Sequence, residues 1–187
     1  MATRLVIDGY GQIELNNVAF RRDGRIEAQC APDTTAFASN KVENGMLLAV
    51  DALNRKLCVP TDGSLPVALN YSTEHIYDER TPGLKNFALN GTGDFLPRVG
   101  YLAVGDKFTT NCVSFDSAKD STWTTQSAFI SALGSIAATP LYGGIGSDDG
   151  SILVSAGAPT VGPKLKVVEK TTMPDGQLGI KFQVIAD

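Results

Sequence analysis

The single histidine, His75, lies in an acidic stretch and is the first candidate for chemistry. Glu74 precedes it, and Asp78, Glu79 and Arg80 follow it. A catalytic histidine needs an oriented partner and a nucleophile, and no G-x-S-x-G motif is present to supply a serine. A zinc-protease helix needs two histidines one turn apart. We therefore expect a surface or interface histidine and a protein that is not an enzyme; a small hydrolase that uses His75 is the alternative.

Calcium binding is the second chemistry that acidic residues suggest. The two acidic segments are residues 74–79 and 146–151. Calcium takes about six to eight oxygen ligands, and the D-x-D-x-D-G order of a calcium loop is absent from both segments. Asp and Gly are the residues that turns use. The sequence therefore predicts solvated turns, with no metal and no cofactor.

The cysteines offer a third possibility, a zinc or redox site. Cys30, Cys58 and Cys112 are widely spaced and form no C-x-x-C pair. Free cysteines are among the most buried residue types, and they are typical of proteins made in a reducing compartment. We expect three buried, reduced thiols in a protein made in the cytoplasm.

Overall charge and hydropathy exclude two further classes of protein. The formal net charge is −4 and the pI is about 5.0, whereas a general nucleic-acid binder normally carries a basic face. No stretch of about 18 consecutive apolar residues is present, so no membrane span is expected. The N-terminal residues also lack the apolar region of a secretory signal.

Turn residues give the strongest structural signal. The pair Asp-Gly occurs five times and favours tight hairpin turns, because Gly accepts a positive φ and Asp tolerates it. Short runs of apolar and β-branched residues, which predict strands, cover 4–8, 12–20, 25–30, 46–51, 56–60, 67–71, 100–106, 107–115 and 151–156, with a hairpin over 165–187. The expected fold is mainly β, a compact β-sandwich or barrel-like domain with one short helix.

One segment has helical spacing of apolar residues. Trp123, Phe129 and Leu133 recur on one face of residues 122–138, and Ser121 or Thr122 is the expected cap. The Gly- and Ser-rich residues that follow predict a mobile loop or a small β-turn excursion.

A Ser-, Thr- and Asp-rich segment after residue 112 suggests a soft boundary. Residues 1–112 are expected to form a β-rich core. Residues 113–187, with the helix, the Gly- and Ser-rich loop and the C-terminal hairpin, would complete the same domain or form a small second lobe.

Four phrases of the sequence resemble a known group of proteins. They are "ENGMLLAVD" at 43–51, "STEHIYDERTPGLKNFAL" at 72–89, "FLPRVGYLAVGDKFTTN" at 95–111 and "KVVEKTTMPDGQLGIKFQVI" at 166–185. The group comprises small structural proteins encoded beside phage major capsid proteins. The likeness covers most of the chain and is weakest over 113–163.

This resemblance implies a bacteriophage head decoration protein, also called an auxiliary capsid or cement protein. Such proteins are compact and β-rich, often form trimers at local threefold positions, and clamp neighbouring capsid subunits against internal DNA pressure. The implied partners are the major capsid protein and further copies of the chain. The implied location is the capsid surface of the virion, after synthesis in the host cytoplasm.

The N-terminal segment is the predicted capsid-contact arm. Its apolar residues are Leu5, Ile7, Tyr10 and Ile13, and an extended arm adds a strand to the exposed sheet edge of a neighbour. The alternative is an ordinary first strand of the chain's own domain.

A second functional hypothesis is a receptor- or glycan-binding β module on a virion surface. Such a module needs exposed aromatic side chains in a concave patch. The available residues are Tyr71, Tyr77, Tyr101, Tyr142 and Trp123.

Overall fold

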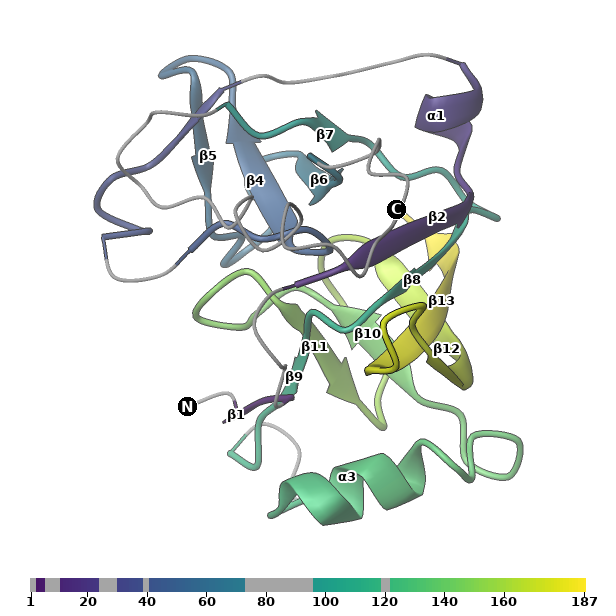
Figure 1. The fold of residues 1–187 in the computed structure, drawn as a ribbon. Coiled ribbons are helices and arrows are strands. Elements are labelled where there is room, and N and C mark those ends of the chain that lie inside the picture. The colour runs from purple at the N-terminus through teal and green to yellow at the C-terminus, as the bar shows by residue number, and fades with distance from the viewer. Residues whose placement is uncertain (1–2, 6–10, 24–29, 39–40, 73–95, 119–121) are drawn as a thin grey trace.

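In the computed structural model the described residues form two β-sheets and short helices (Figure 1). The structure describes residues 3–5, 11–23, 30–38, 41–72, 96–118 and 122–187. The strand predicted over 25–30 falls almost entirely outside these residues. The mainly-β fold class is confirmed.

The larger sheet has eight strands in the order β1-β9-β11-β10-β12-β13-β8-β2. Their bounds are β1 Thr3–Arg4, β2 Ile13–Asn17, β8 Lys107–Thr110, β9 Val113–Phe115, β10 Tyr142–Gly144, β11 Ile152–Ser155, β12 Lys164–Thr172 and β13 Leu178–Ala186. The predicted C-terminal hairpin is β12 and β13. Its turn contains Gly176 at φ 93°, as the Asp-Gly pair predicts.

A short connection shows that this sheet is curled. β8 and β9 are second from opposite edges, so five strand spacings separate them, which is about 24 Å in a flat sheet. Only Asn111 and Cys112 join them, and the three steps from Thr110 to Val113 reach about 11 Å. The sheet therefore bends round until its two sides approach.

The smaller sheet has five strands in the order β3-β5-β4-β6-β7. The strands are β3 Ala31–Pro32, β4 Leu47–Asp51, β5 Lys56–Cys58, β6 Val67–Asn70 and β7 Val99–Gly100. β4 is buried on both faces. Leu47 packs in the core of the larger sheet, while its neighbour Leu48 packs in a second core with Phe37 and Val99.

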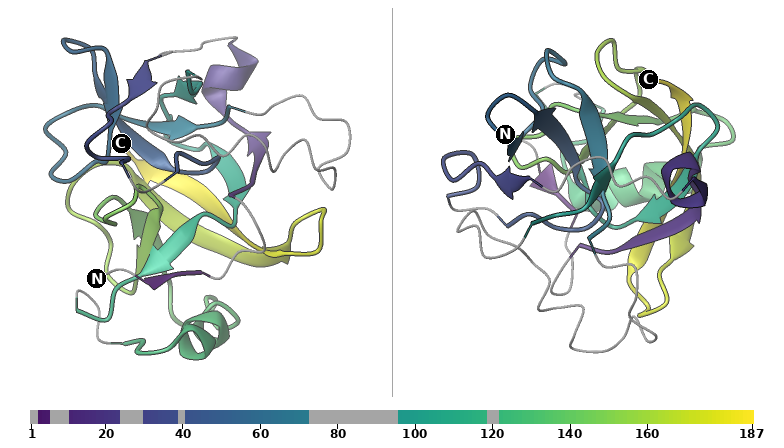
Figure 2. Two further views of the ribbon diagram at one scale, coloured as in Figure 1. Left: turned by 60° about the vertical axis from the view of Figure 1, so that its left-hand side comes forward. Right: turned by 90° about the horizontal axis from the view of Figure 1, so that it is seen from above.

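The smaller sheet and α3 lie at opposite ends of the larger sheet (Figure 2). α3, Gln126–Ala132, is shorter than the predicted helix over 122–138. The expected cap was wrong: Thr125 Oγ1 accepts a hydrogen bond from the Ala128 N–H at 3.3 Å. Phe129 contacts the rings of Phe115 and Trp123, so α3 covers the open end of the core.

Three local predictions were wrong. The strand predicted over 12–20 stops at Asn17, and Ala19–Arg22 forms the single helical turn α1, where Phe20 packs on Tyr71. The strand predicted over 100–106 does not form: only Gly100 belongs to β7, and residues 104–105 form a turn. The run over 107–115 breaks at Asn111, because Thr110 Oγ1 accepts the Cys112 N–H at 3.0 Å and turns the chain.

The Gly- and Ser-rich segment is not one long loop: it contains β10 and β11 joined by a turn, which agrees with the predicted β-turn excursion and with the strand predicted over 151–156. β10 and β11 pair antiparallel near its middle. A Cβ on Gly143 would lie 2.7 Å from Ile152 Cγ2 and 2.8 Å from Phe182 Cε1. The glycine is there because two core side chains occupy that space.

The larger sheet contains strands from both sides of the expected boundary near residue 113. β1, β2 and β8 come from residues 1–112, and the other five strands come from residues 113–187. The two ranges therefore share one sheet.

Candidate functional site

The acidic stretch around His75 lies outside the described residues, as do Ile7, Tyr10 and Tyr77. The expected surface role of His75 stays a prediction. Among the described residues no group of three or more His, Cys, Asp or Glu side chains is placed to hold a metal ion.

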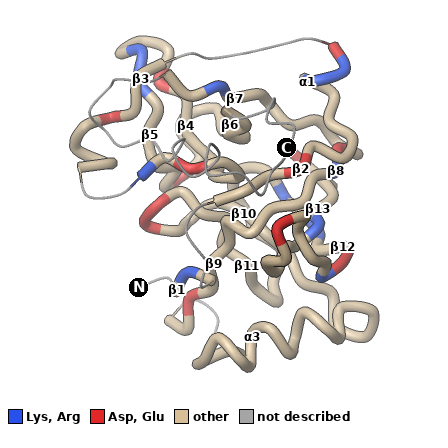
Figure 3. Tube along the Cα trace, in the orientation of Figure 1, with Lys and Arg blue, Asp and Glu red and all other residues tan. Residues whose placement is uncertain are grey.

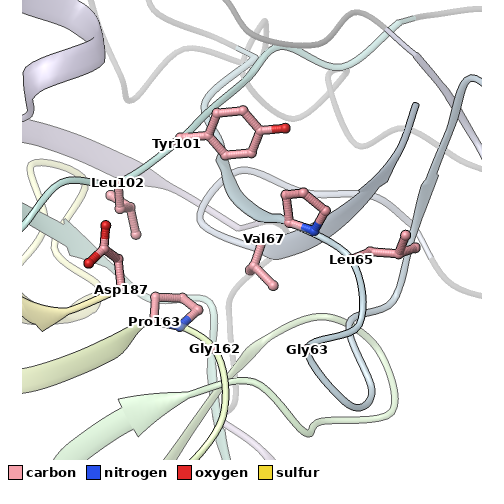
Figure 4. A pocket seen from close by; sticks show the side chains of 9 residues that line it. Gly63, Leu65, Val67, Tyr101, Leu102, Gly162, Pro163 and Asp187 are labelled. Atoms are coloured by element: carbon pink, nitrogen blue, oxygen red, sulfur yellow. The ribbon is translucent and has the colours of Figure 1, made fainter. Parts of the chain in front are cut away.

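A groove lies where four distant segments meet (Figure 4). Its volume is about 390 Å³. The residues that line it are Gly63, Leu65, Pro66, Val67, Tyr101, Leu102, Gly162, Pro163 and Asp187. Two turns, the segment after β7 and the end of the chain thus form one concave surface.

The turn that contains Gly63 lies close against the turn before β12. A Cβ on Gly63 would lie 2.3 Å from Val161 Cγ1, and Gly63 has φ 71°, a conformation that favours glycine. Glycine at this position therefore allows the two turns to approach each other at the groove.

Apolar side chains with a phenol and a carboxylate define the chemistry of the groove. Tyr101 is 36% exposed, whereas Leu102 is buried beneath the surface. Asp187 is exposed and lies beside Leu102. An apolar surface with a few polar groups binds and orients a ligand, and the described residues that line the groove include no serine, cysteine or histidine.

The described parts of the predicted arm belong to the chain's own sheet. Thr3 and Arg4 pair with β9, and the Leu5 N–H donates to Val113 O at 2.9 Å. Leu5 is 3% exposed and lies in the larger core, against which Ile13 is partly buried. These residues therefore form the first strand of the chain's own sheet, which was the alternative to the arm. Docking of the N-terminal segment on a neighbouring subunit stays a prediction.

Arg4 fixes this N-terminal strand electrostatically. Its guanidinium hydrogen-bonds Glu43 and lies 3.4 Å from Cys112 Sγ and 3.9 Å from Asp149 Oδ2. Glu43 also accepts the Gly11 N–H at 3.1 Å. One arginine thus joins the strand edge to the segment before β4 and to the acidic turn before β11.

Burial and these neighbours act in opposite directions on the pKa values. Burial alone would lower the pKa of Arg4, but Cys112 and Glu43 raise it above its ordinary value. Burial raises the pKa of the Cys112 thiol to about 12 despite the arginine. The Cys112 thiol is therefore protonated and structural.

All three cysteines are free, and the prediction of burial holds fully only for Cys112. Cys30 and Cys58 are half-buried.

The acidic turn predicted over 146–151 is a turn in the structure: Asp149 Oδ1 accepts the N–H of Ser151 at 2.9 Å.

The predicted aromatic set is divided between core and surface. Tyr71 and Trp123 are 2% and 3% exposed and pack against Phe20 and Phe129. Of the described members, only Tyr101 and Tyr142 reach the surface.

The groove was not predicted from the sequence, because its lining residues are brought together by the fold and share no sequence pattern.

The fold defines a mainly-β protein built from two sheets, and no helix of its described residues has the length and apolar character needed to span a membrane. No protein-family model, curated protein or solved structure matches the chain.

Proposed function

We propose that this chain is a virion structural protein, a decoration or cement protein that binds the outer surface of an assembled capsid and stabilises it. Its partners are the major capsid protein and further copies of the chain, with a homotrimer as the favoured assembly. Several weak contacts act together, because oligomerisation and neighbouring subunits raise the effective concentration of each contact. A ligand that binds only the assembled shell raises the shell's stability.

The construction of the frame supports this proposal together with the phrases that resemble phage decoration proteins. Leu47 and Leu69 of the smaller sheet are 0% exposed and pack in the core of the larger sheet. Close-packed interiors have low compressibility and transmit strain. Two sheets joined by a shared core suit a protein that holds neighbouring subunits at fixed positions.

The test begins with a search for a major capsid gene beside this chain's gene and uses empty shells of the capsid protein found there. Purified protein is added, and shell disruption is followed by light scattering as the temperature rises. We expect decorated shells to disrupt at a higher temperature than bare shells, and the protein to sediment with them. Equal melting of the two samples would remove the proposal.

A glycan- or receptor-binding module is the second candidate, and one observation favours it. The groove places the exposed phenol ring of Tyr101 and the carboxylate of Asp187 on one concave surface, a combination in which a ring supplies apolar contact and a carboxylate accepts hydrogen bonds. A glycan array separates the hypotheses. Hits that disappear in Tyr101→Ala would support the module, and an array without hits would leave the capsid-binding proposal alone.

A further inference from the structure

A row of four residues crosses the outer face of the larger sheet. Tyr142 on β10 pairs with Lys166 on β12, Lys166 with Gln183 on β13, and Gln183 with Lys107 on β8. Residues directly opposite each other on neighbouring strands share a face. The adjacent row is Val167, Phe182 and Phe108, all buried, so the first row faces away from the core.

Two β-bulges expose aliphatic side chains on β12 and β13, the two central strands of this row. Val167 pairs with Phe182 and Glu169 pairs with Lys181, so Val168 on β12 is the extra residue of one bulge. Leu165 pairs with Val184 and Lys164 pairs with Ala186, so Ile185 on β13 is the extra residue of the other bulge. Both are 40% exposed. Bulges re-aim side chains, and here each one exposes an aliphatic residue within a few residues of a lysine.

The charge of this face is opposite in sign to that of the whole chain. Lys107, Lys164 and Lys166 lie on it, and no acidic side chain among the described residues forms an ion pair with them. The next row on the same face carries Lys181 with two glutamates, Glu14 and Glu169, so the lysines outnumber the acidic residues by four to two. Lys181 lies 4.0 Å from Glu169 in the next row. A protein of net charge −4 thus gathers lysines on one sheet face, where Figure 3 shows basic positions along β8, β12 and β13.

We propose that this lysine face, defined by Lys107, Lys164, Lys166, Val168 and Ile185, docks on an acidic protein surface. Lysines attract carboxylates and steer encounter. The exposed aliphatic side chains of the same two strands fit a partner that offers apolar contact as well. A nucleic acid is a poorer occupant, because the remaining surface of the chain repels phosphates.

The inference rests on the proposed function for the identity of the partner: the acidic surface is on the outside of the capsid shell. The decisive variant is the double charge reversal Lys107→Glu/Lys166→Glu. Its control is Lys41→Glu/Lys170→Glu, which changes the net charge equally. Lys41 is exposed in a loop, and Lys170 pairs with buried Ile180, on the other side of the sheet. Circular dichroism melts establish that both variants fold.

Sedimentation with empty shells is measured at several salt concentrations. We expect the decisive variant to bind about tenfold more weakly than the control, and wild-type binding to weaken as salt rises. Equal binding by wild type, variant and control would overturn the lysine face and leave the proposed function standing.

If wild-type protein fails to sediment with shells, the proposed function fails, and immobilised poly-L-glutamate then tests the face alone. A chain of net charge −4 is retained at low salt only through a local basic surface. Retention of wild type and control, but not of Lys107→Glu/Lys166→Glu, would support the face; retention of all three or of none would overturn it. If the wild-type protein bound duplex DNA more tightly than poly-L-glutamate, the lysine face would be assigned to nucleic acid, and the proposal of an acidic protein partner would be overturned.

Discussion

Arg4 and Glu43, 39 residues apart in the sequence, form an ion pair that fastens the edge strand β1 to the segment before β4. The Glu43 side chain is 8% exposed, and that of Arg4 is 31% exposed. β1 itself contributes only two residue pairs to the sheet. The ion pair therefore adds to the two residue pairs and the buried Leu5 side chain in holding this strand in place.

Removing Arg4 should destabilise the protein. Arg4→Ala leaves the buried Glu43 carboxylate with the Gly11 N–H as its one partner among the described residues, and we expect the free energy of unfolding to fall by about 1–3 kcal/mol. Urea unfolding followed by tryptophan fluorescence measures it. Arg22→Ala, at an exposed arginine of α1, is the control and should change stability by less than about 0.5 kcal/mol.

A double variant tests the pair itself. Arg4→Ala/Glu43→Gln should lose less stability than the sum of the two single variants, since each single change leaves a partner unpaired. Additive losses would show that the arginine acts without Glu43.

The Asp33 carboxylate should titrate at unusually low pH. Lys56 Nζ lies 2.9 Å from Asp33 Oδ2 and, with the N–H groups of Ala36 and Thr35, lowers the pKa of Asp33 from 3.8 to about 2. Because the folded pKa is the lower one, the stabilising contribution is present above about pH 4 and is lost as pH falls from there toward 2. Carbon-detected NMR of the carboxyl group gives the midpoint directly.

Lys56→Met should raise the Asp33 midpoint. The rise should be partial, because two backbone donors remain. Asp62 provides an internal control: Ser64 lowers the pKa of Asp62 through hydrogen bonds that do not involve Lys56, so its midpoint should stay where it is. An unchanged Asp33 midpoint in this variant would contradict the assigned cause.

Cys112 should resist thiol reagents in the folded protein. It is 0% exposed, and burial raises its pKa to about 12, so neither access nor thiolate is available near pH 8. Mass spectrometry after brief alkylation should find label on Cys30 and Cys58 and none on Cys112 until denaturant is added. Labelling of Cys112 as fast as Cys30 would show that β1 and the segment before β4 open readily.

Local patterns predicted the fold class and most strands but not the long-range contacts. The alternation of Leu178, Ile180, Phe182 and Val184 identifies β13 because a half-buried strand has a period of two. No such pattern reveals that Asn111 joins opposite sides of a curled sheet. The lysine face was equally hidden, because the pairing of Lys166 with Gln183 and of Gln183 with Lys107 depends on register.

Gly143 shows most clearly why propensity failed in the Gly- and Ser-rich segment. Glycine is unfavourable in strands, so the segment was predicted as a mobile loop or a small β-turn excursion, and no strand was predicted around Gly143. In the structure the missing side chain makes room for Ile152 and Phe182, both 0% exposed. Sequence alone cannot distinguish a glycine that allows flexibility from one that permits close packing.

Gly143→Ala should therefore destabilise the protein although alanine is a mild change. The added methyl would lie within 2.8 Å of both core side chains, and overpacking of this kind costs about 1–3 kcal/mol of unfolding free energy. Gly157→Ala is the matched control, since no atom lies within 4 Å of its added Cβ, and it should be neutral or slightly stabilising by restricting the unfolded chain. Thermal and urea unfolding of the two variants compare them directly, and equal stability would mean that β10 does not lie against Ile152 and Phe182 as described.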